Sequence, residues 1–146
     1  MNRFMLGVAM LLLFAGSSAA SEIVEAPKAC QQCGMDRVKF AYSRMVIDYA
    51  DGTSDGVCSL NCAVEQMKKY PKKKVKSLIV ADYVTRELVD ARTATWVVGG
   101  DKSGVMTAVP KWSFSRKEDA QKFIKEHDGR LTNFDEALNL ALKENE

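Results

Sequence analysis

The chain is organised around the stretch Cys30-Gln31-Gln32-Cys33-Gly34-Met35, which carries three sulfur side chains in six residues. The two-residue spacer lets both thiolates reach one centre, Gly34 allows a tight turn, and the Met35 thioether can point to the same centre. A second pair, Cys58 and Cys62, completes the four cysteines of the chain. This pattern predicts a metal or redox site.

The residues alone leave four interpretations of the cysteines open. Structural disulfides are the usual role of an even number of cysteines in an exported protein, but closing a four-residue loop removes only about 2 kcal/mol of unfolded-state entropy. Four thiolates could instead hold zinc. The thioethers of Met35 and Met106 would favour copper(I), for which they are better ligands than for zinc. A thiol-disulfide oxidoreductase is the fourth interpretation, although residues 21–29 do not supply the strand that precedes a thioredoxin-like motif.

Residues 1–20 have the pattern of a secretory signal peptide. Arg3 precedes an apolar run from Phe4 to Ala15, and small residues follow as far as Ala20. We therefore expect an exported protein with a cleaved signal peptide and no stable membrane span, because the apolar run is shorter than the about 18–20 residues of a spanning helix. Without this segment the chain has 20 basic and 19 acidic side chains. That balance argues against a nucleic-acid partner.

The hydrophobic periodicity of residues 21–146 predicts one α+β domain. Strands are expected at 40–49, 53–58, 75–82, 94–98, 105–114 and 130–131, and helices at 60–70, 115–128 and from 134 onward. Ser59 and Asn133 are the expected N-caps, and Ser115 with Glu118 forms an expected capping box. The repeated order of elements predicts two related ββαβ units packed together, at about residues 36–86 and 90–146, with a C-terminal helix.

Two further residues bear on the chemistry. Cys62 would lie in the first turn of the helix that Ser59 caps, where the partial positive charge should lower its thiol pKa. His127 is the only histidine of the chain, so a two-histidine copper centre and a three-histidine zinc centre are excluded within one chain. Phosphate-binding glycine loops and nucleophile elbows are also absent from the sequence, and we expect no enzymatic activity.

The sequence resembles the NosL family, whose members are accessory factors of nitrous-oxide reductase. Besides the two cysteine segments, the resemblance rests on Val80-Ala81-Asp82-Tyr83, Asp90-Ala91, Trp96-Val97-Val98-Gly99-Gly100, Gly104-Val105-Met106-Thr107, Lys111-Trp112-Ser113-Phe114 and Phe134-Asp135-Glu136-Ala137. It implies a periplasmic metallochaperone that binds copper(I) and delivers it to a client copper protein, nitrous-oxide reductase. It also implies a fold of two related ββαβ units.

The resemblance implies a copper(I) site in which Cys33 and Met35 match the Cys-Gly-Met part of the family motif and Met106 matches a methionine of the second half. The chain departs from many relatives because it has no lipobox and no histidine near these motifs. We expect a low-coordinate copper(I) site on Cys33 and Met35. Cys30 and Met106 would assist, and the second cysteine pair would provide neighbouring ligands or a redox pair. The full expected ligand set is Cys30, Cys33, Met35, Cys58, Cys62 and Met106.

Overall fold

The computed structural model describes residues 24–146, so the expected signal peptide at residues 1–20 lies outside the described residues. The elements are β1 (Met45–Tyr49), β2 (Ser54–Val57), α1 (Leu60–Lys69), β3 (Val75–Ala81), β4 (Leu88–Asp90), β5 (Thr95–Val98), β6 (Lys111–Phe114), α2 (Lys117–His127), β7 (Arg130–Thr132) and α3 (Phe134–Glu144). This is an α+β fold with a C-terminal helix, as expected. Among residues 24–146, no helix is long and apolar enough to cross a bilayer.

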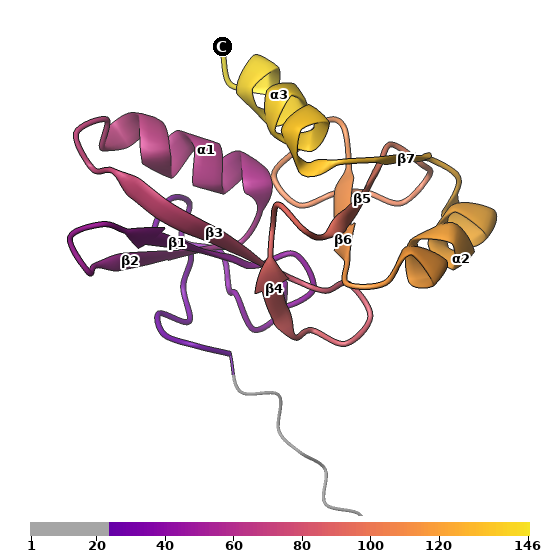
Figure 1. Cartoon of the computed structure of the whole chain (residues 1–146), viewed down its shortest axis with the longest axis horizontal. Coiled ribbons are helices and arrows are strands. Elements are labelled where there is room, and N and C mark those ends of the chain that lie inside the picture. The colour runs from indigo at the N-terminus through magenta and orange to yellow at the C-terminus, as the bar shows by residue number, and fades with distance from the viewer. Residues whose placement is uncertain (1–23) are drawn as a thin grey trace, which may run out of the picture.

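Two antiparallel sheets lie side by side, each with its own helix (Figure 1). The strand orders are β2-β1-β3-β4 and β6-β5-β7. In each sheet the first strand of the unit is central and pairs antiparallel with the two strands that follow it. The prediction of two related ββαβ units is therefore confirmed. Strand β4 is an addition that the sequence analysis missed, because three residues are too few to show a period-two pattern.

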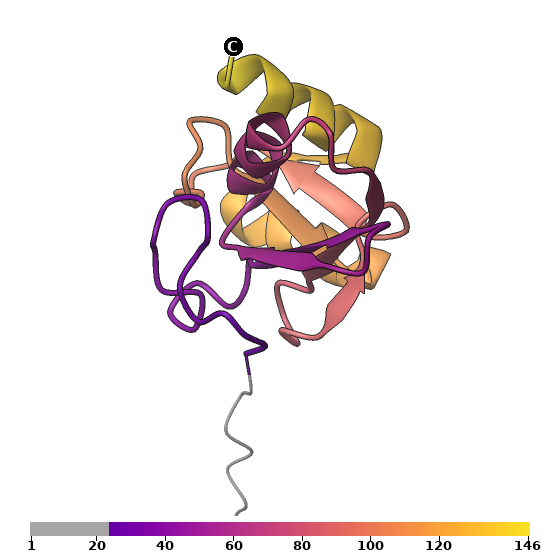
Figure 2. The same cartoon turned by 90° about the vertical axis from the view of Figure 1, so that its left-hand side faces the viewer.

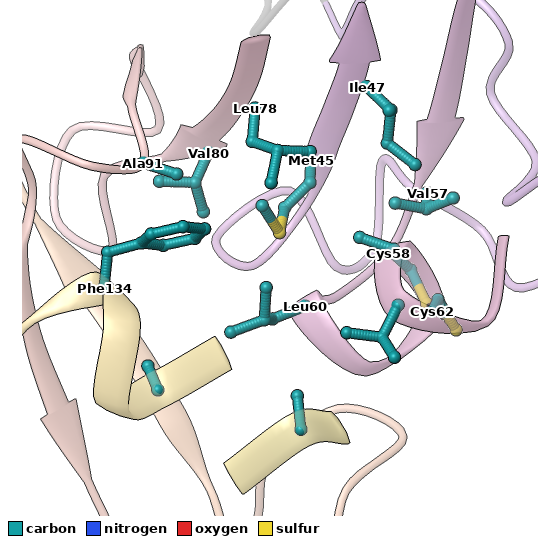
Figure 3. Packing of buried hydrophobic residues seen from close by; sticks show 14 of the residues in the cluster. Met45, Ile47, Val57, Cys58, Leu60, Cys62, Leu78, Val80, Ala91 and Phe134 are labelled. Atoms are coloured by element: carbon teal, nitrogen blue, oxygen red, sulfur yellow. Dashed lines mark hydrogen bonds between the residues drawn. The ribbon is translucent and has the colours of Figure 1, made fainter. Parts of the chain in front are cut away.

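Helix α3 holds the two units together. Helix α1 packs on β1 and β2, α2 packs on the second sheet, and α3 lies against both α1 and β5. Figure 2 shows α3 crossing over α1 at the top of the molecule. The main hydrophobic core consequently spans the units, and Phe134 of α3 packs with residues of the first sheet (Figure 3).

Three predictions about local structure are wrong. Residues 105–110 form a loop, and the strand begins only at Lys111, because Pro110 has no N–H to donate to a ladder. Residues 40–43 form turns, and β1 begins only at Met45. Ser115 makes no capping box: α2 has Arg116 as its N-cap without a side-chain bond, and the Ser115 hydroxyl donates to Asp82 over 2.8 Å.

Arg37 fixes the segment that leads into the first cysteines. Its side chain is fully buried and donates to the carbonyl oxygens of Glu25, Pro27, Met45 and Val57 at 2.9, 2.5, 3.2 and 3.2 Å. The guanidinium also pairs with the Glu25 carboxylate. This buried cation thus ties residues 24–29 to β1 and β2.

The close packing around Arg37 requires a glycine in β2. A Cβ atom added to Gly56 would lie 2.6 Å from Arg37 Nη1 and 3.0 Å from Pro27 Cδ. Arg44 strengthens the same attachment, because its Nε donates to the other oxygen of Glu25 over 3.0 Å. The three residues Glu25, Arg37 and Arg44 therefore form one ion-pair cluster beneath the N-terminal segment.

A polar network around Glu144 joins the two units. Lys111 Nζ of β6 lies 2.8 Å from Glu144 Oε2 and 3.1 Å from Asn61 Oδ1, and Asn61 Nδ2 donates to Glu144 over 2.5 Å. Thr107 Oγ1 adds a bond of 2.7 Å to the same carboxylate. Burial opposes ionisation of this group, but the hydrogen bonds from Lys111, Thr107 and Asn61 outweigh it and lower the pKa of Glu144 to about 2.

Replacing Arg37 with methionine should destabilise the fold by about 3 kcal/mol or more. The Glu25 carboxylate would lose its buried ion pair, and four carbonyl oxygens would lose their hydrogen-bond donor. The free energy of unfolding in urea measures the loss. The matched control is Arg116→Met, whose side chain is 67% exposed and whose effect should stay within about 0.5 kcal/mol. Equal effects of the two variants would contradict the role of Arg37.

The Glu144 carboxylate should make the free energy of unfolding depend on pH in the acidic range. Its folded pKa of about 2 lies below the ordinary value of 4.5, so its contribution is complete above about pH 5 and is lost as the pH falls toward about 2. Glu144→Gln should therefore cost about 2–3 kcal/mol near pH 6 and progressively less in acid, measured by urea unfolding at several pH values. A cost that is constant with pH would contradict this assignment.

Candidate metal centre

The four cysteines, which are distant in sequence, form one cluster. All four sulfur atoms lie within 4.8 Å of one another. Cys58 Sγ lies 3.5 Å from Cys33 Sγ and 3.6 Å from Cys62 Sγ. All four are free thiols; Cys33 is exposed and the other three are buried. The structure thus brings together the four cysteines that the sequence analysis named as candidate ligands.

A tight turn presents the first pair. The Gly34 N–H donates to Cys30 O and the Cys30 N–H donates to Met35 O, each over 2.8 Å. Gly34 has a φ of +78°, a left-handed conformation that is accessible to glycine at little cost. The turn therefore places both thiols of the Cys-x-x-Cys motif on one side of the chain, as the sequence indicated.

Gln31 anchors this turn to the edge of the first sheet. Its N–H donates to Gly56 O over 3.0 Å, and its side-chain Oε1 accepts from the Gly56 N–H over 2.5 Å. Its amide nitrogen donates to Asp55 Oδ1 over 3.1 Å. The buried Asp55 also accepts from Tyr49 and Gln66, both over 2.9 Å. The sequence analysis missed this scaffold, because a polar residue in a strand gives no sign of its distant partners.

The second pair lies where β2 passes into α1. Cys58 follows the last residue of β2, and its N–H donates to Cys30 Sγ over 3.3 Å. Ser59 is the N-cap of α1 and accepts from the Cys62 N–H over 3.2 Å. This predicted cap is confirmed, and it places Cys62 in the first helical turn. Figure 3 shows the Cys58 and Cys62 sulfurs together at one end of the hydrophobic core.

The cluster favours a negative charge on Cys30. Hydrogen bonds from the Cys58 and Cys62 thiols, together with backbone N–H groups of Cys33 and Gln32, lower the pKa of Cys30 far below that of an ordinary thiol. The Cys58 thiol donates to Cys30 and is buried, so its pKa is raised. The contact with Cys30 and burial likewise raise the pKa of Cys62 to about 12.

The expectation that the helix N-terminus makes Cys62 the thiolate is therefore wrong. Ser59 and Cys58 do act to lower the Cys62 pKa, but the contact with Cys30 and burial outweigh them. A charge already present on a neighbouring sulfur and loss of water both oppose a second thiolate. A bound cation would remove this opposition, since it stabilises every thiolate around it.

The spacing of the sulfur atoms suits a soft metal ion. In a tetrahedral site with metal–sulfur bonds of about 2.3 Å, the sulfurs lie about 3.8 Å apart. Two of the present separations are 3.5 and 3.6 Å, and all are within 4.8 Å. Sulfur donors in this number select copper(I) or zinc over hard cations such as magnesium. The cluster can also form a disulfide, because its thiols are neighbours.

The two candidate methionines have different surroundings. Met35 is half-buried against the core that contains the buried cysteines, and it belongs to the same turn as Cys33. Met106 is 51% exposed and has a φ of +53° in the loop between β5 and β6. The adjacent Val105 and Thr107 line a small cleft with Ser59, Leu60 and Asn61. The loop that carries Met106 thus lies beside the start of α1.

His127 lies at the end of α2, as expected, where its ring is 4.8 Å from the Phe123 ring centroid and its Nδ1 is 3.3 Å from Asp101 Oδ1. These contacts agree with a structural or exposed histidine. It does not belong to the four-sulfur cluster.

The profile of the NosL family matches residues 22–140. Among solved structures, the chain is similar to the crystal structure of the copper chaperone NosL from Shewanella denitrificans, with 24% sequence identity and a TM-score of 0.61. The match covers 80% of this chain and 95% of that chain, and at this identity it shows the fold alone. No curated protein matches the chain. The family profile spans most of the described residues, and the chain therefore belongs to the NosL family.

Proposed function

We propose that this protein is a periplasmic copper(I) chaperone without catalytic turnover. The observation that carries the proposal is the cluster of four free thiols whose sulfurs lie within 4.8 Å of one another. Thiolates are soft ligands that hold copper(I) in preference to hard cations. Membership of the NosL family and likeness to a copper chaperone support copper as the cargo.

In this proposal the cysteines hold the metal and the methionines assist. Cys30, Cys58 and Cys62 would provide buried sulfur donors, and Cys33 would provide the exposed one. Met35 adjoins the cluster through the turn that it closes with Cys30. Met106 belongs to the loop between β5 and β6, and its role would require its exposed side chain to reach the cluster from that loop.

The client and the compartment are parts of the same proposal. The signal-peptide pattern of residues 1–20 supports export to the periplasm. The NosL family supports delivery of copper(I) to a client copper protein, nitrous-oxide reductase or a relative of it. Cargo delivery requires a site that a partner can reach, and Cys33 is exposed.

A zinc-binding structural protein is the second candidate, because four thiolates can close a tetrahedron around zinc. The sulfur spacing fits a zinc site as well as it fits a copper(I) site. An oxidoreductase has less support, because Cys30 and Cys33 lie in a turn and not at the start of a helix.

Parallel titrations with copper(I) and zinc should separate these candidates. The reduced protein should bind one copper(I) ion in competition with a chromogenic chelator and should bind zinc much more weakly. Binding is read from the chelator spectrum for each metal. Tighter binding of zinc would contradict the chaperone proposal in favour of a structural zinc site, and turnover of a dithiol substrate would favour the oxidoreductase.

The variant Met35→Leu tests whether the Met35 thioether contributes to copper(I) binding. The substitution keeps the apolar volume, so the fold should persist while copper(I) affinity falls about tenfold and zinc affinity stays unchanged. Met67→Leu is the matched control, since Met67 also packs against the main core but lies on α1 beyond the cysteines. Equal losses for both metals in Met35→Leu would exclude a role of its sulfur in selecting copper.

A further inference from the structure

We propose that Cys33 is the exchange ligand of the four-sulfur cluster, through which copper(I) passes to a partner that offers thiolate or thioether sulfur. This inference rests on the proposed copper function and assigns different tasks to the four thiols. Cys30, Cys58 and Cys62 retain the ion, and Cys33 is replaced by the sulfur of the partner. The proposal rests on the observation that the four thiols differ in burial and in how firmly the fold holds them.

Three of the thiols are enclosed by the fold. Cys30, Cys58 and Cys62 are only 3%, 0% and 3% exposed. Cys58 directly follows β2, Cys62 belongs to the first turn of α1, and Cys30 Sγ accepts the Cys58 N–H. At this burial a partner side chain cannot contact these three sulfurs without a local movement of the chain.

Cys33 lies on the open side of the turn. Gln31 attaches the first half of the turn to β2, whereas Cys33 and Gly34 are exposed. A Cβ atom added to Gly34 would meet no heavy atom within 4 Å. The space beside the Gly34 backbone is thus open, and together with the exposure of the adjacent Cys33 it leaves a side from which an incoming sulfur can approach. Figure 2 shows the N-terminal segment, in indigo, at the side of the sheets.

The exchange leaves copper in the same oxidation state. A bond forms between copper(I) and the sulfur of the partner, and the bond between copper(I) and Cys33 Sγ breaks. The released Cys33 thiolate takes up a proton. An incoming thiol supplies this proton as it binds in its thiolate form, and water supplies it when the partner offers a thiolate or a thioether. Because three sulfur contacts remain during the first replacement, a bare ion is never released into water.

Transfer kinetics test this assignment. Copper(I)-loaded wild type and Cys33→Ser are mixed with bathocuproine disulfonate at increasing concentrations, and the absorbance of the copper–chelator complex is followed. The wild-type rate should rise in proportion to the chelator concentration. Cys33→Ser should retain copper(I) at equilibrium within about tenfold of wild type but transfer it about tenfold faster, because the open position is already free.

Two outcomes would overturn the inference: a transfer rate that does not depend on chelator concentration, or a loss of affinity above about 100-fold in Cys33→Ser. The second would make Cys33 a retaining ligand. Failure of the wild type itself to bind copper(I) would instead overturn the proposed function.

Alkylation of the wild type provides a test that needs no variant to fold. In the copper(I)-loaded protein, iodoacetamide should modify Cys33 at least about tenfold faster than the other three cysteines, and copper should remain bound. Peptide mass spectrometry locates the label and the metal content is measured beside it. Equal protection of all four cysteines, or loss of copper together with labelling of Cys33, would contradict the assignment.

Discussion

The structure depends on the burial of the Arg37 guanidinium between the N-terminal segment and the first sheet. A buried cation is stable only when charge and hydrogen bonds surround it, and here the Glu25 carboxylate and four carbonyl oxygens do so. These bonds hold residues 24–29 against β1 and β2. The turn that follows is consequently fixed beside Cys58, and the four sulfurs can meet.

The two units share a topology but have different roles. All four cysteines belong to the first half of the chain. The second unit has an aromatic core around Trp112 and Phe123 and supplies α3, which packs on α1. Through Lys111 and Glu144 it also holds Asn61, the residue before Cys62. The second unit therefore supports the helix on which one of the candidate ligands lies.

Local signals predicted what depends on neighbouring residues. Ser59 and Asn133 are N-caps because their side chains accept N–H groups three residues later. The pattern at 105–110 was misleading because an apolar run also suits a loop that packs on another element. Ser115 failed as a capping box because Asp82, 33 residues away, competes for its hydroxyl and its N–H. A hydrogen-bond partner that is far away in the sequence cannot be recognised from the pattern of neighbouring residues.

The sequence by itself determined the chemistry available to this protein: four thiols in two close pairs, flanked by methionine, on an α+β chain of two related units. Only the tertiary structure decided how those thiols combine. It joined the pairs into one cluster, made Cys30 the preferred thiolate and left Cys33 exposed. The physical reason is that the pKa and the exposure of each thiol depend on the distances between segments. Buried groups such as Arg37 and Asp55 set these distances, and the order of residues does not specify them.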